Sequence, residues 1–188
     1  VGDRAQLVFG NSGTYLEDIR RIIRKKPFRE YSLTTNYRST AEIMRFALKI
    51  MGRSESDSAA LCVRSGPAPA VIRVSAEEQG NAVAQFIREM QEKGYENIAI
   101  LCKSAAAVSE ALSAVHLPQK VAAEVNLKVL PIYLAKGLEF DAVAIWNADR
   151  ETYGETGDQN LLYTAVTRAM HEVRLFYSGE SSPFFTDC

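Results

Sequence analysis

Residues 127–147 read LKVLPIYLAKGLEFDAVAIWN, two apolar runs separated by a short polar turn. The runs, 127–133 and 141–147, are mostly apolar and include β-branched residues, which is typical of strands that are buried on both faces. Gly137 stands in the turn between them, where a tight bend or a close approach of the backbone to a ligand is favoured. This stretch therefore predicts two strands of a mainly parallel sheet, joined by a short turn.

The rest of the chain alternates between similar apolar runs and amphipathic helical patterns. Helices between buried strands supply the crossovers of a parallel sheet, so the predicted fold is α/β and doubly wound. In such a sheet we expect the binding crevice beyond the carboxyl ends of the strands. Residues 52–69, small and polar with Pro and Gly, predict a long loop. The other predicted strands are 70–74, 97–102 and 173–178, and the predicted helices are 14–24, 40–51, 77–93, 105–115 and 158–171.

Composition limits the function classes that remain open. A chain of 188 residues that is 47% hydrophobic fits one domain with one good core. Its net charge of −1 gives no overall attraction to a polyanion, so binding of nucleic acid would need a local, positively charged groove. Three cysteines without paired spacing argue against a zinc site and a disulfide framework. With no apolar run of membrane-spanning length, we expect a soluble, cytoplasmic protein.

The segment NYRST (36–40) lies just before the predicted helix 40–51. Ser39 or Thr40 can cap that helix. Tyr37 offers a flat face on which a base can stack, and Arg38 offers a fork that suits phosphate oxygens. The alternative is a partly buried tyrosine and a solvated arginine at a helix start.

Two further segments carry candidate binding residues. In KGLEFD (136–141), the Glu139 carboxylate can accept hydrogen bonds from a ribose, and Lys136 can lie near a phosphate or near that carboxylate. The alternative is an ordinary turn with exposed charges. On the predicted helix 158–171, Arg168 lies off the apolar stripe and has Thr164, not an acid, four residues before it. It is either a solvated side chain or an arginine finger for a transferring phosphoryl group.

In this order the segments resemble the second RecA-like domain of the UvrD/Rep helicases, which are superfamily-one, ATP-driven motor proteins. Residues 1–6 are similar to the third helicase motif, NYRS to the fourth, KGLEFD to the fifth and YTAVTRA (163–169) to the sixth. The resemblance runs from Val1 to about Tyr177. It implies a RecA-like domain over residues 1–188 that belongs to a longer protein with a further, N-terminal ATPase domain.

The resemblance also implies a role in ATP binding for residues of all four motifs. In this family pattern Tyr37 stacks on the adenine, and Glu139, after Lys136 and Gly137, contacts the ribose. Gln6 senses the γ-phosphate, and Arg38 and Arg168 bind it. The chain has no Gly-Lys dipeptide for a phosphate loop and no acidic pair after a strand for Mg²⁺. We therefore expect the Mg²⁺ ligands on the N-terminal domain, and negligible ATP hydrolysis by this polypeptide alone.

The departures from the family pattern fall on the nucleic-acid side. Asn11 and Ser12 stand where the family has an aromatic–arginine pair that stacks on a single-stranded base, and Pro131 and Tyr133 replace a threonine and a histidine. Only a helix and a short connection join the strands 97–102 and 127–133, where UvrD/Rep proteins insert a large domain. This pattern resembles the HelD branch, helicase-like ATPases associated with bacterial RNA polymerase.

Three functions stay open on the sequence. The first is an ATP-dependent DNA helicase or translocase that steps along single-stranded DNA. The second is an ATPase bound to RNA polymerase that remodels its partner without unwinding long duplexes. The third is a nucleotide-binding α/β domain with no motor role.

Overall fold

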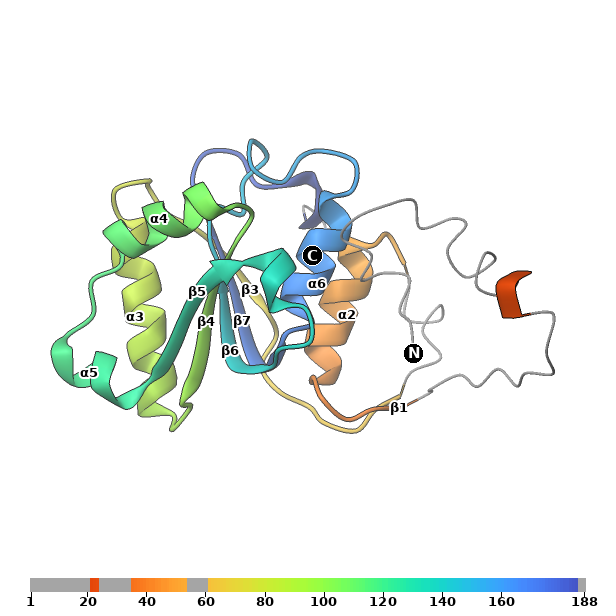
Figure 1. The fold of residues 1–188 in the computed structure, drawn as a ribbon, viewed down its shortest axis with the longest axis horizontal. Helices are drawn as coiled ribbons and strands as arrows, with labels where there is room; N and C mark the ends of the chain where they lie inside the picture. The colour runs from red at the N-terminus through yellow and green to blue at the C-terminus, as the bar shows by residue number, and fades with distance from the viewer. Residues whose placement is uncertain (1–20, 24–34, 54–60, 186–188) are drawn as a thin grey trace.

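The computed structural model describes residues 21–23, 35–53 and 61–185. A five-stranded sheet forms the centre of this region (Figure 1), with strand order β3-β7-β6-β4-β5 and every neighbouring pair parallel. The prediction of a doubly wound α/β fold is confirmed. The strands are β3 (Ala70–Arg73), β4 (Asn97–Cys102), β5 (Asn126–Pro131), β6 (Phe140–Ile145) and β7 (Ala169–Tyr177).

Helices cover both faces of the sheet, and each face has its own cluster of buried side chains. On one face lie α2 (Ala41–Ile50) and α6 (Asp158–Val166); on the other lie α3 (Gln79–Glu92), α4 (Ala105–Ala114) and α5 (Gln119–Glu124) (Figure 1). Because both faces are covered, the central strands have no solvent side, and every residue from Ile98 to Cys102 is buried. This explains why they read as continuous apolar runs.

Local sequence sets the ends of the helices on both faces. Thr40 precedes α2 in an extended conformation, and its hydroxyl accepts a hydrogen bond from the Ile43 N–H at 3.4 Å. Ser104 caps α4 in the same way through the Ala107 N–H at 3.2 Å. Of the two caps that the sequence allowed for α2, the structure therefore uses Thr40.

The predicted helix 158–171 is wrong over its last five residues. α6 ends at Val166, and β7 begins at Ala169, so the segment YTAVTRA passes from a helix into a strand. The residues 169–172, Ala-Met-His-Glu, have a composition that suits a helix, but Ala169 pairs with Phe140 at the start of β6. Tertiary pairing overrides the local preference here.

Smaller differences affect the segments around the sheet. The strand predicted at 127–133 ends at Pro131, and η3 (Ile132–Ala135) is a 3-10 turn. The loop predicted at 52–69 contains β2 (Leu61–Cys62), which pairs in parallel with β1 (Thr35–Asn36). The predicted helix 14–24 lies mostly outside the described residues.

The connection from β4 to β5 holds only the short helices α4 and α5. Trp146, just after β6, is 2% exposed, as its interpretation as a packing residue predicted. Within the described ranges, no helix combines the length and the apolar character that crossing a membrane requires.

Candidate functional site

The segment 36–40 forms a tight loop that enters α2. The Asn36 side-chain oxygen accepts hydrogen bonds from the backbone N–H groups of Arg38, at 2.9 Å, and Ser39, at 3.3 Å. An asparagine that bonds to the backbone two residues ahead builds such a turn locally. The buried Ser39 hydroxyl donates to the Ala169 carbonyl at 2.8 Å, which ties the loop to the first residue of β7. Neither the Asn36 turn nor the Ser39–Ala169 hydrogen bond was predicted from the sequence.

Tyr37 and Arg38 project from this loop toward solvent. Tyr37 is 71% exposed, so its ring is accessible for stacking against a ligand. The Arg38 Nε lies 2.5 Å from a Glu139 carboxylate oxygen, and both side chains are about 40% exposed. The structure thus brings together two predicted site residues that are about a hundred positions apart in the chain.

Glu139 follows a turn that joins η3 to β6. Gly137 has a φ of 86°, a left-handed conformation that is unfavourable for residues with a Cβ, and the Leu138 N–H donates to the Ala135 carbonyl at 3.0 Å. Lys136 is exposed at the start of this turn. The register shift between Phe140 and Ala142 places an irregularity at the start of β6, as is common beside functional sites.

Arg168 lies beneath that turn. It is 1% exposed, and its guanidinium donates to the Leu138 carbonyl at 3.3 Å and, through Nε, to the Thr164 carbonyl at 3.2 Å. The sequence placed Arg168 on a helix, off the apolar stripe. It lies instead at the junction of α6 and β7, where the chain turns inward to join the sheet.

Six of the seven predicted site residues therefore lie in three segments that contact one another. Arg38 pairs with Glu139, and Arg168 bonds to the carbonyl of the residue before Glu139. Gln6 lies outside the described residues. The expected convergence of the motif arginines on one rim of the sheet is consistent with this arrangement.

The rim itself differs from the expected one. Glu139 directly precedes β6 and Arg168 directly precedes β7, so the segments gather at the amino ends of these strands. The general rule for open α/β sheets places ligands at the carboxyl ends. The expectation was wrong because the motif residues stand before their strands, and a parallel sheet puts all strand starts on the same edge.

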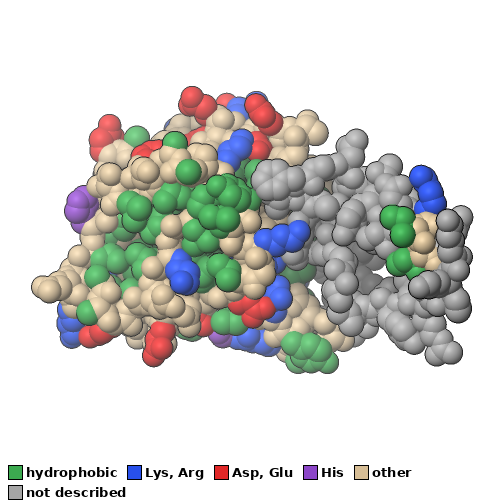
Figure 2. All heavy atoms as spheres, in the orientation of Figure 1, with side chains coloured by type: hydrophobic (Ala, Val, Ile, Leu, Met, Phe, Trp, Pro, Cys, Tyr) green, Lys and Arg blue, Asp and Glu red, His purple; other side chains and the backbone are tan. Residues whose placement is uncertain are grey.

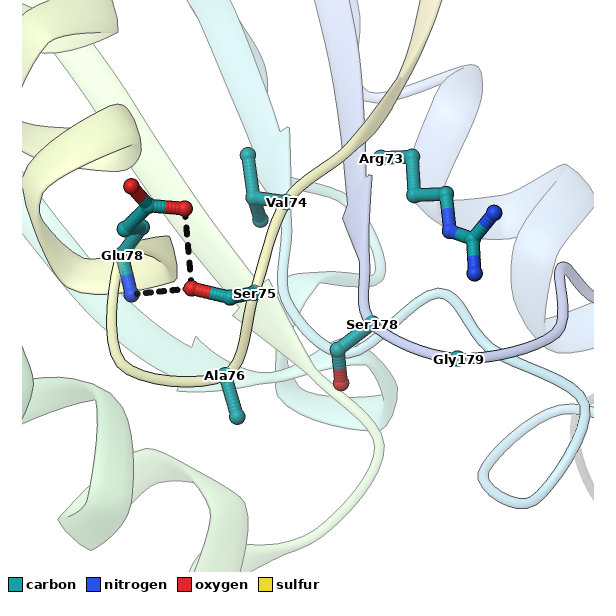
Figure 3. Close-up of a pocket in the computed structure, with 7 residues that line it drawn as sticks. All are labelled: Arg73, Val74, Ser75, Ala76, Glu78, Ser178 and Gly179. Atoms are coloured by element: carbon teal, nitrogen blue, oxygen red, sulfur yellow. Dashed lines mark hydrogen bonds between the residues drawn. The ribbon is translucent and has the colours of Figure 1, made fainter.

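The carboxyl edge carries a shallow, open hollow of about 500 Å³ instead. Ser75, Glu78 and Ser178 line it, beyond the ends of β3 and β7 (Figure 3), and the Ser75 hydroxyl bonds to the Glu78 carboxylate at 2.8 Å. None of the predicted site residues that the structure describes lines this hollow. We do not assign it a ligand.

The exposed groups of the rim suit an anionic nucleotide better than a metal. Tyr37, Arg38 and Glu139 offer a ring face, a guanidinium and a carboxylate, all accessible from solvent. No group of three or more His, Cys, Asp or Glu side chains suitable for a metal ion occurs within residues 21–23, 35–53 and 61–185.

Comparison with solved structures identifies the fold and its family. The crystal structure of the C-terminal domain of a possible DNA helicase from Lactobacillus plantarum WCFS1 matches 80% of this chain and 92% of its own, with a TM-score of 0.64 and 32% sequence identity. This chain belongs to the UvrD-like helicase C-terminal domain family. The model of that family matches residues 126–176, from β5 through β7. No curated protein sequence matches the chain.

The matched region of this UvrD-like domain contains part of the candidate site. Lys136, Gly137, Glu139 and Arg168 all fall within residues 126–176, whereas the Tyr37–Arg38 pair precedes them. The two parts of the site meet through the Arg38–Glu139 ion pair. The family match therefore includes Glu139 but not Arg38, and only the tertiary structure shows that the two side chains meet.

Proposed function

We propose that this domain is the C-terminal motor domain of an ATP-dependent DNA helicase or translocase, and that it contributes one side of an ATP site shared with an N-terminal RecA-like domain. The observation that carries the proposal is the meeting of three motif segments at one rim, through the Arg38–Glu139 pair and the Arg168–Leu138 hydrogen bond. Family membership supports the motor role. ATP-driven closure of the two domains then moves the protein along single-stranded DNA.

Each exposed group of the rim has a proposed part in nucleotide binding. Tyr37 stacks on the adenine, Arg38 binds the γ-phosphate, and Glu139 accepts hydrogen bonds from the ribose, with Lys136 and Gly137 forming the turn beside it. Arg38 and Glu139 must first separate from each other. Since their ion pair is partly exposed, its loss costs about 1 kcal/mol or less, and charge-assisted bonds to a triphosphate can replace it.

Arg168 fits the proposed γ-phosphate role less directly. Its guanidinium is buried and donates to protein carbonyls, so a direct phosphate contact requires those bonds to be exchanged. In the arrangement described here it holds the turn that presents Glu139. We propose that Gln6 and the Mg²⁺ ligands of the N-terminal domain complete the site, where the metal supplies charge neutralisation of the phosphates.

ATP affinity and ATPase rate of the full-length protein test the proposal, with and without single-stranded DNA. We expect Tyr37→Ala and Arg38→Ala each to weaken ATP binding by about tenfold, the effect of about 1.4 kcal/mol. The matched control is Arg150→Ala, which removes an arginine paired with Glu180 at 3.2 Å in an exposed position. ATP affinity that is unchanged in both site variants would contradict the proposal. The 188-residue chain alone should hydrolyse ATP negligibly.

A second candidate is an ATPase of the HelD type that remodels RNA polymerase. Tyr133 and Leu134 on η3, and Leu138 in the next turn, are 40%, 58% and 39% exposed, and hydrophobic side chains gather on the face that carries β5 and α4 (Figure 2). Exposed apolar groups next to the rim suit a protein surface better than a phosphate backbone. ATPase activity independent of DNA, with co-purification of RNA polymerase, would favour this candidate; stimulation by single-stranded DNA at low salt would favour the first.

A further inference from the structure

A segment outside the helicase motifs packs against the loop that carries Tyr37 and Arg38. Residues 64–66, Arg-Ser-Gly, follow β2 and form what we call the 64–66 brace. The Val63 N–H donates to the Asn36 carbonyl at 3.3 Å, and the Ala41 N–H donates to the Arg64 carbonyl at 2.8 Å. Val63, just before the brace, therefore contacts the start of the loop, and Arg64 of the brace contacts the residue that follows the loop. The sequence indicated only a loop here.

The brace is also clamped to the first turn of α2. The Glu42 carboxylate accepts hydrogen bonds from the Ser65 hydroxyl and from the Gly66 N–H, each at 2.8 Å. A Cβ on Gly66 would approach the Thr40 Cγ2 to 2.7 Å, so only glycine allows this close packing. Thr40 is the cap of α2. The brace thus has a defined position relative to the helix that the loop enters.

From this position the Arg64 side chain reaches two partners. Its Nη1 donates to the Arg38 carbonyl at 3.1 Å, and its Nη2 lies 2.7 Å from Nδ1 of His171 on β7. A guanidinium can only donate, so the imidazole must be neutral to accept this bond. Burial, followed by the charge of Arg64, lowers the pKa of His171, which favours the neutral ring. The ring also stacks on Tyr95 with centroids 4.9 Å apart.

We propose that Arg64 is a positioning residue for the nucleotide site: anchored by His171, its guanidinium fixes the Arg38 carbonyl and so orients the Tyr37–Arg38 pair. Arg64 acts through the backbone of that pair and makes no contact with the nucleotide. Without this bond the Asn36 turn still forms, but the loop loses its connection to β7 on that side. This inference rests on the proposed function, because it assigns Arg64 to the same ATP site.

A double-mutant cycle on ATP affinity tests the inference in the full-length protein, by competition with a fluorescent ATP analogue. We expect Arg64→Ala to weaken ATP binding by about fivefold, the effect of one lost hydrogen bond. In the Tyr37→Ala/Arg38→Ala background the same change should weaken binding by less than about twofold, since nothing remains to be oriented. A purely structural role predicts additive effects. Arg150→Ala is the control, because it removes an arginine that is far from the rim.

Two further variants keep the test independent of the folding of Arg64→Ala. His171→Phe retains a ring to stack on Tyr95 but removes the acceptor of Arg64, and we expect it to weaken ATP binding about twofold to threefold. Arg64→Lys retains one donor and should recover part of the affinity. Unchanged affinity in Arg64→Ala and His171→Phe, or additive effects in the cycle, would overturn the positioning role alone. Unchanged affinity in Tyr37→Ala and Arg38→Ala would overturn the proposed function, and the positioning role with it.

Discussion

Replacement of Arg168 by alanine should destabilise the domain even where no nucleotide is present. The side chain is 1% exposed, and its removal leaves the Leu138 carbonyl without this donor, whereas the Thr164 carbonyl keeps the Thr167 hydroxyl at 3.1 Å. This hydrogen bond is only partly buried, so an acceptor that loses its partner here costs about 1–2 kcal/mol. The lost Cγ and Cδ methylenes add about 1.6 kcal/mol.

An opposing effect reduces this sum, because the variant no longer buries a charge. We therefore expect the free energy of unfolding of Arg168→Ala to fall by about 2–3 kcal/mol, and its Tm by roughly 4–12 °C. The displaced turn should also affect ATPase activity. A loss of ATPase activity in Arg168→Ala would then reflect a displaced 137–139 turn in addition to any lost phosphate contact.

Equilibrium urea unfolding of the 188-residue chain measures this effect, with Arg150→Ala as the matched control. The control removes an exposed arginine and should change the free energy of unfolding by less than about 0.5 kcal/mol. A urea midpoint of Arg168→Ala equal to that of the unsubstituted chain would refute the view that Arg168 supports the turn. In that case the charge of Arg168 would have to act on a ligand, and the ATPase assay of the variant would report that role directly.

Three other predictions concern packing and pH. Gly80→Ala should lower the free energy of unfolding by about 1–3 kcal/mol in urea unfolding, because a Cβ would lie 2.3 Å from the Ala114 backbone oxygen; unchanged stability would contradict the close packing of α3 on α4. Ser39→Ala should cost about 1–2 kcal/mol by calorimetry, since it leaves the buried carbonyl of the first residue of β7 without that donor, and a cost near zero would argue against the tie. The Ser65 hydroxyl, with backbone N–H groups, lowers the pKa of Glu42 to about 2, so stability present above about pH 4.5 should decline as the pH falls toward 2. Glu42→Gln should flatten that decline in acid titrations followed by circular dichroism, and an equal slope in both proteins would count against the contact.

The sequence by itself determined the layered architecture and the candidate residues. Apolar strands such as 97–102 are recognisable because burial on both faces leaves no polar positions, and the caps of α2 and α4 follow from local hydrogen bonds within three residues. The chemistry of Tyr37, Arg38 and Glu139 was also predictable, since ring, guanidinium and carboxylate are properties of the residues themselves. These inferences need no knowledge of distant neighbours.

Only the tertiary structure decided which edge of the sheet carries the site and how its parts meet. The Arg38–Glu139 contact joins segments about a hundred residues apart, and no local pattern encodes such a pair. The strand that begins at Ala169 forms because Phe140 lies opposite, against the helical preference of its own residues. Arg168 is buried, and Arg64 reaches His171, for the same reason: both depend on which segments the sheet brings side by side.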